Sequence, residues 1–267
     1  MSIAALNNAL SGLKTSQRAL GVISDNIANA NTEGYVRKVA EPSSIVLDGQ
    51  GAGVEIGRIS RVVDEYLLRE KREETGELKE VEALEIYFNE VQDLFGQPGD
   101  NNSIASLVER LQPALQNYEI SPEDSFRAQQ VVDAADDIAF KLNEMHYALQ
   151  DLRARADNEI GDNVDTLNTL LNQVDEFNID IITAEAKGQD AGGLRDKRDV
   201  ALNNISEIIG INYFENSDGA VSITTSGGKT LLDVDAITVF HDVPNGLRSD
   251  IAFDPDRVIN DPDLGTI

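Results

Sequence analysis

The chain contains no cysteine, no tryptophan and only two histidines. The absence of cysteine excludes disulfides, thiol catalysis and thiolate metal sites, and it suits either redox environment. Aromatic residues make up only 5% of the 267 residues, although hydrophobic residues as a whole reach 41%. An apolar content dominated by Leu, Ile, Val and Ala favours long helices over an aromatic-rich globular core.

Long apolar runs are also missing. No stretch of about 18 consecutive apolar residues occurs, so no membrane-spanning helix is expected. The N-terminus lacks the basic start and the solid apolar run of a secretory signal peptide. If the protein leaves the cytoplasm, we expect it to do so with this N-terminus intact.

The net charge of −26 is distributed unevenly. Residues 1–60 hold five basic and five acidic side chains, so the whole acidic excess lies in residues 61–267. A strongly acidic body repels phosphate backbones, which argues against a general nucleic-acid-binding role. The excess is compatible with a plain solvated surface. It also suggests a neutral tip that packs against other subunits while the acidic body faces water.

The first 30 residues carry a heptad pattern, in which Gln17 and Ser24 fill the two polar positions of an apolar seam. The apolar members of this seam are Ile3, Leu6, Leu10, Leu13, Leu20 and Ile27. The pattern predicts a helix over residues 3–30, about 40 Å long at roughly 1.5 Å per residue. Periodicity alone leaves open whether the seam packs on this chain's own core or pairs with other subunits.

The remaining pattern predicts extended segments over residues 35–60, then long amphipathic helices from Ser60 or Asp64 to Ile209. Ser103 is a candidate helix cap, and Ser121-Pro122-Glu123-Asp124 is a helix start signal. The last residues alternate like short strands, with turns at 217–219 and 226–228. The predicted fold is mainly α: long antiparallel helices in a coiled-coil-like bundle, an N-terminal assembly helix and a C-terminal β-rich portion.

This organisation divides into three expected domains. Residues 1–60 form the assembly helix and an extended linker, residues 61–209 form the long-helix bundle, and residues 210–267 form a β-rich domain that is expected to be incomplete.

Catalytic groups are hard to assemble from this sequence, and we predict no enzyme activity. His146 and His241 have no partners at metal-ligand spacing. The aspartates at 254, 256, 261 and 263 lack the glycine and glutamate of a calcium loop. The glycines at 51, 53 and 57 have no buried strand before them and no helix directly after them, as a nucleotide loop requires. No cofactor or metal site is predicted.

One motif is specific. The stretch from Ser24 to Arg37 reads SDNIANANTEGYVR. Asn and Thr can bond to backbone groups freed at a helix end, and Gly34 allows a sharp turn. Tyr35 can anchor the outgoing chain, while Arg37 can pair with a neighbouring subunit. The motif residues are Asn26, Ala30, Asn31, Thr32, Gly34, Tyr35 and Arg37.

This motif resembles the N-terminal signature of flagellar axial proteins from the rod, the hook and the hook–filament junction. Three further regions are similar to the hook-associated proteins of the junction. They are residues 53–67, the helical region from Asn101, and residues 192–199 with the turns at 218–221 and 226–228. Rod and hook proteins share the first motif, but they are expected to lack the long helical region in the middle of this chain.

The resemblance implies a structural subunit at the hook–filament junction. It implies export through the flagellar type III apparatus with an uncleaved signal, and a location outside the cell in the flagellum. The implied partners are other copies of the chain in a ring, the hook protein, the neighbouring junction protein, the export apparatus and an export chaperone. No nucleic acid, membrane or cofactor is expected.

Two alternatives remain open. One is a hook or rod protein, and the other, from a different class, is a surface adhesin or binding module carried by residues 210–267. In the axial family the N-terminal helix pairs with a C-terminal helix of the same chain. No such heptad helix precedes Ile267, so the chain is expected to be a fragment or a short atypical member.

Overall fold

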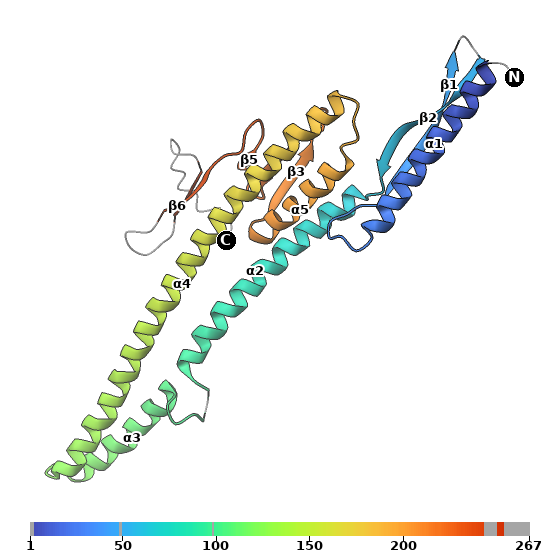
Figure 1. Ribbon diagram of the computed structural model, residues 1–267. Coiled ribbons are helices and arrows are strands. Elements are labelled where there is room, and N and C mark those ends of the chain that lie inside the picture. Colours follow the sequence, from blue (N-terminus) through green and yellow to red (C-terminus); the bar gives the residue numbers. More distant parts are fainter. Residues whose placement is uncertain (1–2, 48–49, 98, 243–249, 254–267) are drawn as a thin grey trace. The chain divides into compact units, whose positions relative to one another are not determined.

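The computed structural model describes residues 3–47, 50–97, 99–242 and 250–253. Long helices dominate, and short strands gather towards the C-terminal side (Figure 1), which confirms the predicted fold class. None of the helices described is both long enough and apolar enough to cross a membrane. The helices are α1 (Ile3–Ala28), α2 (Glu65–Phe95), α3 (Ile104–Ile120), α4 (Ser125–Ala186) and α5 (Gly192–Ile208).

The strands form small antiparallel sheets. β1 (Lys38–Leu47) and β2 (Gln50–Arg61) pair as a hairpin in which Lys38 lies opposite Arg61. β3 (Ile211–Glu215), β4 (Val221–Thr225) and β5 (Thr230–Leu232) form a three-stranded sheet in that order. β6 (Val239–Asp242) and β7 (Asp250–Phe253) form a two-stranded sheet.

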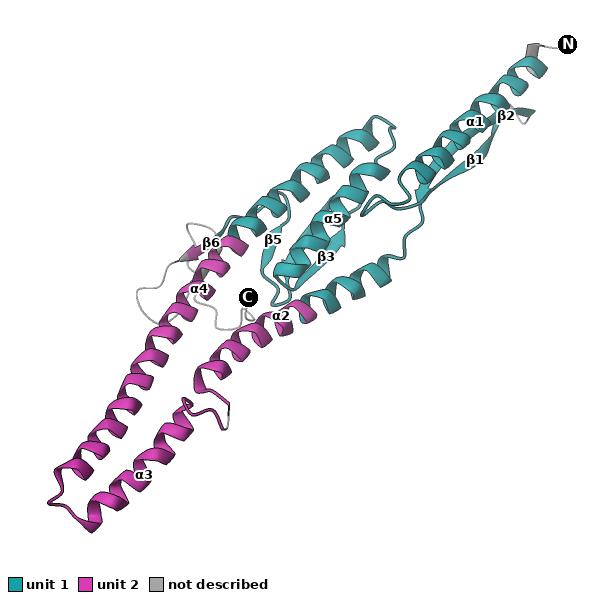
Figure 2. Ribbon diagram, turned by 60° about the horizontal axis from the view of Figure 1, so that its bottom comes forward, with its two compact units in different colours: residues 1–77, 164–240, 251–267 teal, residues 78–163, 241–250 magenta. Residues whose placement is uncertain are grey.

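The chain forms two compact units, coloured separately in Figure 2. Unit 1 comprises residues 1–77, 164–240 and 251–267, and unit 2 comprises residues 78–163 and 241–250. Helices α2 and α4 each contribute to both units, because the boundaries fall inside them. The three-domain division expected from the sequence stays a prediction.

Side-chain caps fix the helix starts. The Ser103 hydroxyl accepts a hydrogen bond from the backbone N–H of Ser106, so the predicted cap of α3 is confirmed. At α4 the start differs from the prediction: residues 121–124 close a turn, and the Asp124 carboxylate accepts from the N–H of Phe126. The helix then continues through Gly161 without a break, since a helical glycine costs only about 1 kcal/mol relative to alanine.

The core of unit 1 lies between α4, α5 and the strands that follow them. On α4 the buried apolar side chains recur mostly every three or four residues, from Leu167 to Ile181, as expected for an amphipathic helix. Helix α5 contributes Leu202 and Ile205, which are almost fully buried. The strands complete this core with Val221, Ile223, Leu231, Leu232 and Val239.

Two asparagines of α4 attach strands to the helix. The Asn178 amide accepts from the N–H of Val221 and donates to its C=O, both at 2.9 Å. Asn168 binds both backbone groups of Val239 in the same way, at 2.8 Å. Each amide replaces one missing strand neighbour, which satisfies strand groups that would otherwise be buried without partners.

Unit 2 contains the α3–α4 hairpin and the C-terminal part of α2. Leu107, Met145 and Leu152 are its buried apolar side chains. The α2 and α4 segments of this unit are joined by polar contacts: the Tyr87 hydroxyl donates to the Glu159 carboxylate, and Arg155 pairs with Glu90.

These contacts predict an unusual tyrosine titration. Burial and the hydrogen bond to Glu159 raise the pKa of Tyr87 to about 12, whereas the pKa of a free tyrosine is about 10. Neutral Tyr87 therefore stabilises the fold fully below about pH 10, and this stability is lost as the pH rises towards 12. A pH titration of phenolate absorbance should show one late tyrosine that is missing in Tyr87→Phe. A Tyr66→Phe control should keep the late tyrosine, and its loss there would contradict this assignment.

Candidate assembly segment

Helix α1 lies on the β1–β2 hairpin through a face of mostly small or polar residues. The half-buried residues of α1 recur mostly every three or four positions and are Ser11, Gly12, Thr15, Ala19, Val22 and Asn26. At about 100° per residue, this stripe lies roughly 170° around the helix from the apolar seam. The hairpin therefore contacts the face opposite the seam.

The docked face approaches the strand backbone closely. The Ser11 hydroxyl accepts from the N–H of Val54 at 3.1 Å, and the Thr15 hydroxyl donates to the Val54 C=O at 3.0 Å. At Gly53 the backbone has a φ of +124°, and a Cβ there would lie 2.3 Å from the Ser11 Oγ. Glycine is therefore required for this approach.

The predicted seam residues share the other face of α1, and their side chains are exposed. The exposed fractions are 61% for Leu6, 46% for Leu10, 56% for Leu13, 61% for Leu20 and 72% for Ile27. Ile3 begins the helix, but its side chain lies outside the described part of the chain. Among the described residues, the seam is not covered by the core of this chain.

The motif after α1 folds back onto the helix through Asn26. The Asn26 amide accepts from the N–H of Lys38 and donates to its C=O, both at 2.8 Å. The same amide oxygen accepts from the Tyr35 hydroxyl at 3.0 Å. The Lys38 ammonium lies 4.5 Å from the centroid of the Tyr35 ring. Asn26 and Tyr35 together fix where the hairpin begins relative to the helix.

The other motif residues divide into turn formers and exposed positions. Thr32 donates its hydroxyl to the Asn29 side chain, and its C=O accepts from the N–H of Tyr35. Gly34 has a φ of +75° and packs against α5. Ala30, Asn31 and Arg37 are exposed, and Arg37 makes no ion pair within the described residues.

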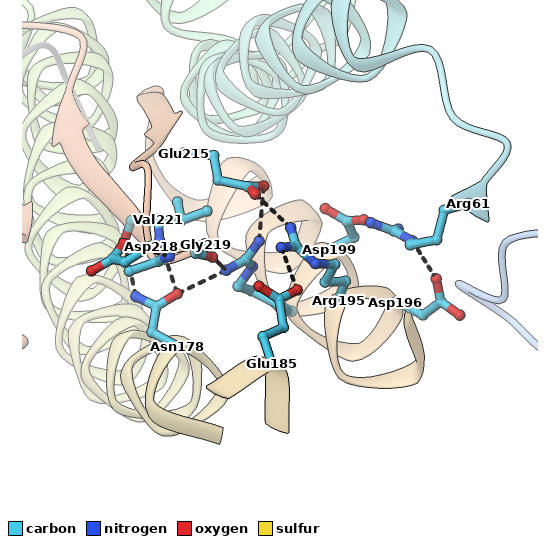
Figure 3. A network of polar contacts seen from close by, with 12 residues as sticks. Arg61, Asn178, Glu185, Arg195, Asp196, Asp199, Glu215, Asp218, Gly219 and Val221 are labelled. Atoms are coloured by element: carbon cyan, nitrogen blue, oxygen red, sulfur yellow. Dashed lines mark hydrogen bonds and ion pairs between the residues drawn. The ribbon is translucent and has the colours of Figure 1, made fainter. Parts of the chain in front are cut away.

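A cluster of ion pairs joins the hairpin to α5 and α2 inside unit 1. The Asp196 carboxylate of α5 pairs with Lys38 at 3.0 Å and with Arg61 at 2.9 Å. One turn later, Asp199 pairs with Arg61 and, at 3.0 Å, with Arg72 of α2. Part of this cluster is visible in Figure 3. All five side chains are at most 15% exposed, so water screens these pairs only weakly.

A second set of polar contacts joins α5 to α4 and the β3–β4 turn (Figure 3). The Arg198 guanidinium donates to the Asn178 side chain at 3.0 Å and to the Gly219 C=O at 2.6 Å. Desolvation by burial lowers the pKa of Arg198. Burial also acts against the charge of Arg195, but hydrogen bonds to Glu215 and Glu185 raise the pKa of Arg195 overall.

The two histidines and the glycines that the sequence analysis considered for metal or nucleotide binding lie in the following surroundings. His146 stacks edge-on with Tyr147, and His241 lies 3.1 Å from Asp157. Gly51, Gly53 and Gly57 all lie within β2. The aspartates at 254, 256, 261 and 263 lie outside the described residues. Within the described part of the chain, no group of three or more His, Asp or Glu side chains is placed to hold a metal ion.

Two features of this segment are missing from the sequence predictions. The small-and-polar stripe of α1 could have been detected in the sequence, because its residues recur at helical spacing opposite the seam. The ion pairs of Asp196 and Asp199 leave a weaker sequence signal, which is the mixture of opposite charges in Arg195-Asp196-Lys197-Arg198-Asp199. Their partners are more than 120 positions away in the chain, so local patterns could not identify them.

Gly34 provides a first test of the motif. A Cβ at this residue would lie 2.1 Å from the Val200 Cγ2, and its positive φ disfavours other residues. Gly34→Ala should lower the free energy of unfolding by roughly 1–3 kcal/mol, measured by urea denaturation. The double variant Gly34→Ala/Val200→Ala should destabilise less than the sum of the single variants, since it removes the clash but not the backbone strain. Strict additivity would show that Gly34 does not pack against Val200.

Arg198 provides a second test. Arg198→Met keeps the apolar stem, leaves the Gly219 carbonyl without its donor and removes one of the two arginines that bind Glu215. We expect a loss of roughly 1–3 kcal/mol in the free energy of unfolding. The neighbouring Lys197→Met is the matched control, because Lys197 is exposed and should change stability by less than about 0.5 kcal/mol. Equal effects of the two substitutions would contradict the structural role of Arg198.

Comparisons with known proteins identify related sequences over most of the chain. The family model of the flagellar hook-associated protein FlgK helical domain matches residues 88–261, and that of the flagella basal body rod protein matches residues 6–35. The chain is 23% identical to flagellar hook-associated protein 1 of Escherichia coli (strain K12), over 98% of this chain and 51% of that protein. It is 25% identical to the Bacillus subtilis (strain 168) protein of the same name, over 86% and 47%.

The structural likeness is one of fold. The flagellar hook junction protein FlgK from Burkholderia pseudomallei aligns with a TM-score of 0.58 at 20% identity, covering 70% of this chain and 33% of that one. The chain spans about half the length of the curated relatives that it matches. Since the helical-domain model alone matches well over half of the sequence, the chain belongs to the family of the flagellar hook-associated protein FlgK.

Proposed function

We propose that this chain is a structural subunit of the hook–filament junction and that it polymerises through α1. The observation that carries the proposal is the exposed seam, in which five leucine and isoleucine side chains are 46–72% exposed along one helix face. Fully burying one such side chain gains about 1.5–3 kcal/mol. Covering the seam in an assembly therefore supplies several kcal/mol per subunit, and leaving it in water is unfavourable.

The manner in which α1 is held supports the proposal. The contacts between α1 and the hairpin include hydrogen bonds of Ser11, Thr15 and Asn26 and use the face opposite the seam. The hairpin is in turn held to α5 and α2 by the ion pairs of Asp196 and Asp199. The seam is thus presented on a supported helix, which lowers the conformational entropy that assembly would cost.

Family membership supports the wider context. Relatives named flagellar hook-associated protein 1 match nearly the whole chain, and the rod-protein model matches the α1 region. We infer a subunit that is exported by the flagellar type III apparatus with its N-terminus uncleaved and that forms a ring at the hook tip. Its inferred partners are further copies, the hook protein, the neighbouring junction protein, the export apparatus and an export chaperone. Its inferred location is the extracellular flagellum.

The seam can be tested directly. Leu13→Gln/Leu20→Gln should abolish retention of the subunit in flagella and release it into the medium, because polar amides cannot replace the buried apolar contacts of an assembled seam. Immunodetection in isolated flagella and in culture supernatant measures both fractions. The thermal unfolding of the purified chain should stay unchanged, since both side chains are already exposed.

The matched control is Val234→Gln, which replaces an apolar side chain that is 83% exposed but far from α1 in the sequence. This control should be retained in flagella normally. Normal retention of the seam variant would rule out polymerisation through α1, whereas retention of neither variant would point to a general effect of polar substitution.

A further inference from the structure

Unit 1 contains a groove of about 780 Å³ between α1, β2, α2 and α5 that is unusually rich in arginine. The chain has 14 arginines, and six of them line this groove. These six are Arg18, Arg58, Arg61, Arg69, Arg195 and Arg198. Such a concentration of cations is notable in a protein with a net charge of −26.

Half of these arginines are already neutralised within the unit. Arg61 pairs with Asp196 and Asp199, and the arginines at 195 and 198 pair with Glu215. These pairs account for Asp199 and Glu215 among the acids that line the groove.

The remaining three arginines, at positions 18, 58 and 69, come from α1, β2 and α2 and are exposed. None of them pairs with a carboxylate among the described residues. The other acids of the groove are Glu185, which pairs with Arg195, Glu65, which is exposed, and Asp190, whose carboxylate accepts from the N–H of Gly192. These three arginines therefore leave the groove with an excess of positive charge, and a carboxylate-bearing partner would complement it.

A suitable surface exists in unit 2 of the same chain. Residues 78–163 contain 18 acidic and 6 basic side chains. On α4, three aromatic side chains are separated by multiples of seven residues and are strongly exposed: Phe126 by 68%, Phe140 by 75% and Tyr147 by 71%. Asp133, Asp136 and Glu144 lie on the same side of the helix, away from the buried Met145 and Leu152. We call these six residues the acidic-aromatic face of α4.

We propose that the arginine groove of one copy binds the acidic-aromatic face of α4 from a second copy. Guanidinium groups pair with carboxylates in a fork geometry and also stack on aromatic rings, so arginine suits both components of this face. The chain already uses such stacking, since Arg69 lies 5.6 Å from the centroid of the Tyr213 ring.

A second copy fits better than an unrelated acidic partner for a reason of symmetry. The groove and the acidic-aromatic face are two different surfaces of one chain, so their contact is head-to-tail. Repeating such a contact generates rings or helical arrays. The inference rests on the proposed function in this respect, because it assigns one lateral contact within the same assembly.

Charge exchange tests the contact in the 267-residue chain. Arg58→Glu/Arg69→Glu should weaken self-association at low salt by about tenfold or more, and Asp133→Lys/Asp136→Lys should do the same. The quadruple variant should recover most of the association, because the charges are exchanged rather than lost. Sedimentation velocity over a concentration series gives each constant. Arg110→Glu, a charge reversal on α3 of unit 2, is the control and should have little effect.

The absence of native cysteine allows an independent test. Arg58→Cys in one preparation and Asp136→Cys in another can form only an intermolecular disulfide when mixed and oxidised. We expect a disulfide-linked heterodimer on non-reducing gels, and little from the control mixture of Arg58→Cys with Glu109→Cys. Unchanged association of the charge variants together with no heterodimer above the control would overturn the inference.

The outcomes separate this inference from the proposed function. Loss of association in the Leu13→Gln/Leu20→Gln variant, with no effect of the arginine substitutions, would refute the groove contact and leave polymerisation through α1 intact. Weakened association in the arginine variants alone would refute the role of α1 and support the groove contact. Circular dichroism on every variant identifies any that fail to fold.

Discussion

The ionic junction at the start of α5 is the constraint on which the rest of unit 1 depends. Two carboxylates one turn apart, Asp196 and Asp199, bind cations from three separate segments, namely Lys38, Arg61 and Arg72. A two-stranded hairpin is marginally stable alone, and α1 forms hydrogen bonds to this one through hydroxyl and amide groups. A buried pair contributes little net stability over an apolar pair, but loss of one partner leaves a costly unpaired charge. The junction therefore acts mainly by specifying one arrangement of hairpin, α2 and α5.

Asparagine side chains also specify the arrangement of helices and strands, at three places. Asn26, Asn168 and Asn178 each use one side-chain amide to bind both the N–H and the C=O of a single strand residue. Such pairs hold a helix against a strand without apolar contact at that point, and they tolerate little displacement because both bonds are lost together. In α1 this has a further consequence. Since polar groups hold the helix to its hairpin, the leucines and isoleucines of the seam are not needed for docking and remain available on the opposite face.

The sequence predicted those features that depend on local pattern. The single helix face shared by Leu6 to Ile27, the amphipathic pattern of α4 and the Ser103 cap follow from periodicity or from groups a few residues apart, and the structure contains all three. The start of α4 differed from the prediction because residues 121–124 form a turn and Asp124 caps the helix after it. A proline signal does not distinguish a helix that starts at the proline from a turn that precedes the helix. The ion pairs of Asp196 could not be predicted, because they join residues that are at least 135 positions apart. Glycine is needed at position 53 because Ser11 of α1 approaches it closely. This contact depends on tertiary structure and could not be predicted from the local sequence.

The distribution of charge gains a physical meaning from these contacts. Residues 1–60 are neutral overall, but their basic side chains differ in whether they are paired. Lys38 is neutralised inside unit 1, whereas Arg18 and Arg58 line the groove and have no carboxylate partner among the described residues. Acidic bodies brought together in an assembly repel one another, and this repulsion must be offset locally. An apolar seam supplies affinity but little orientation, because the hydrophobic effect is non-directional. Fork-shaped arginine contacts supply orientation at modest affinity. Salt would separate the two proposed contributions, since screening weakens charge contacts while leaving the burial of apolar side chains largely unaffected.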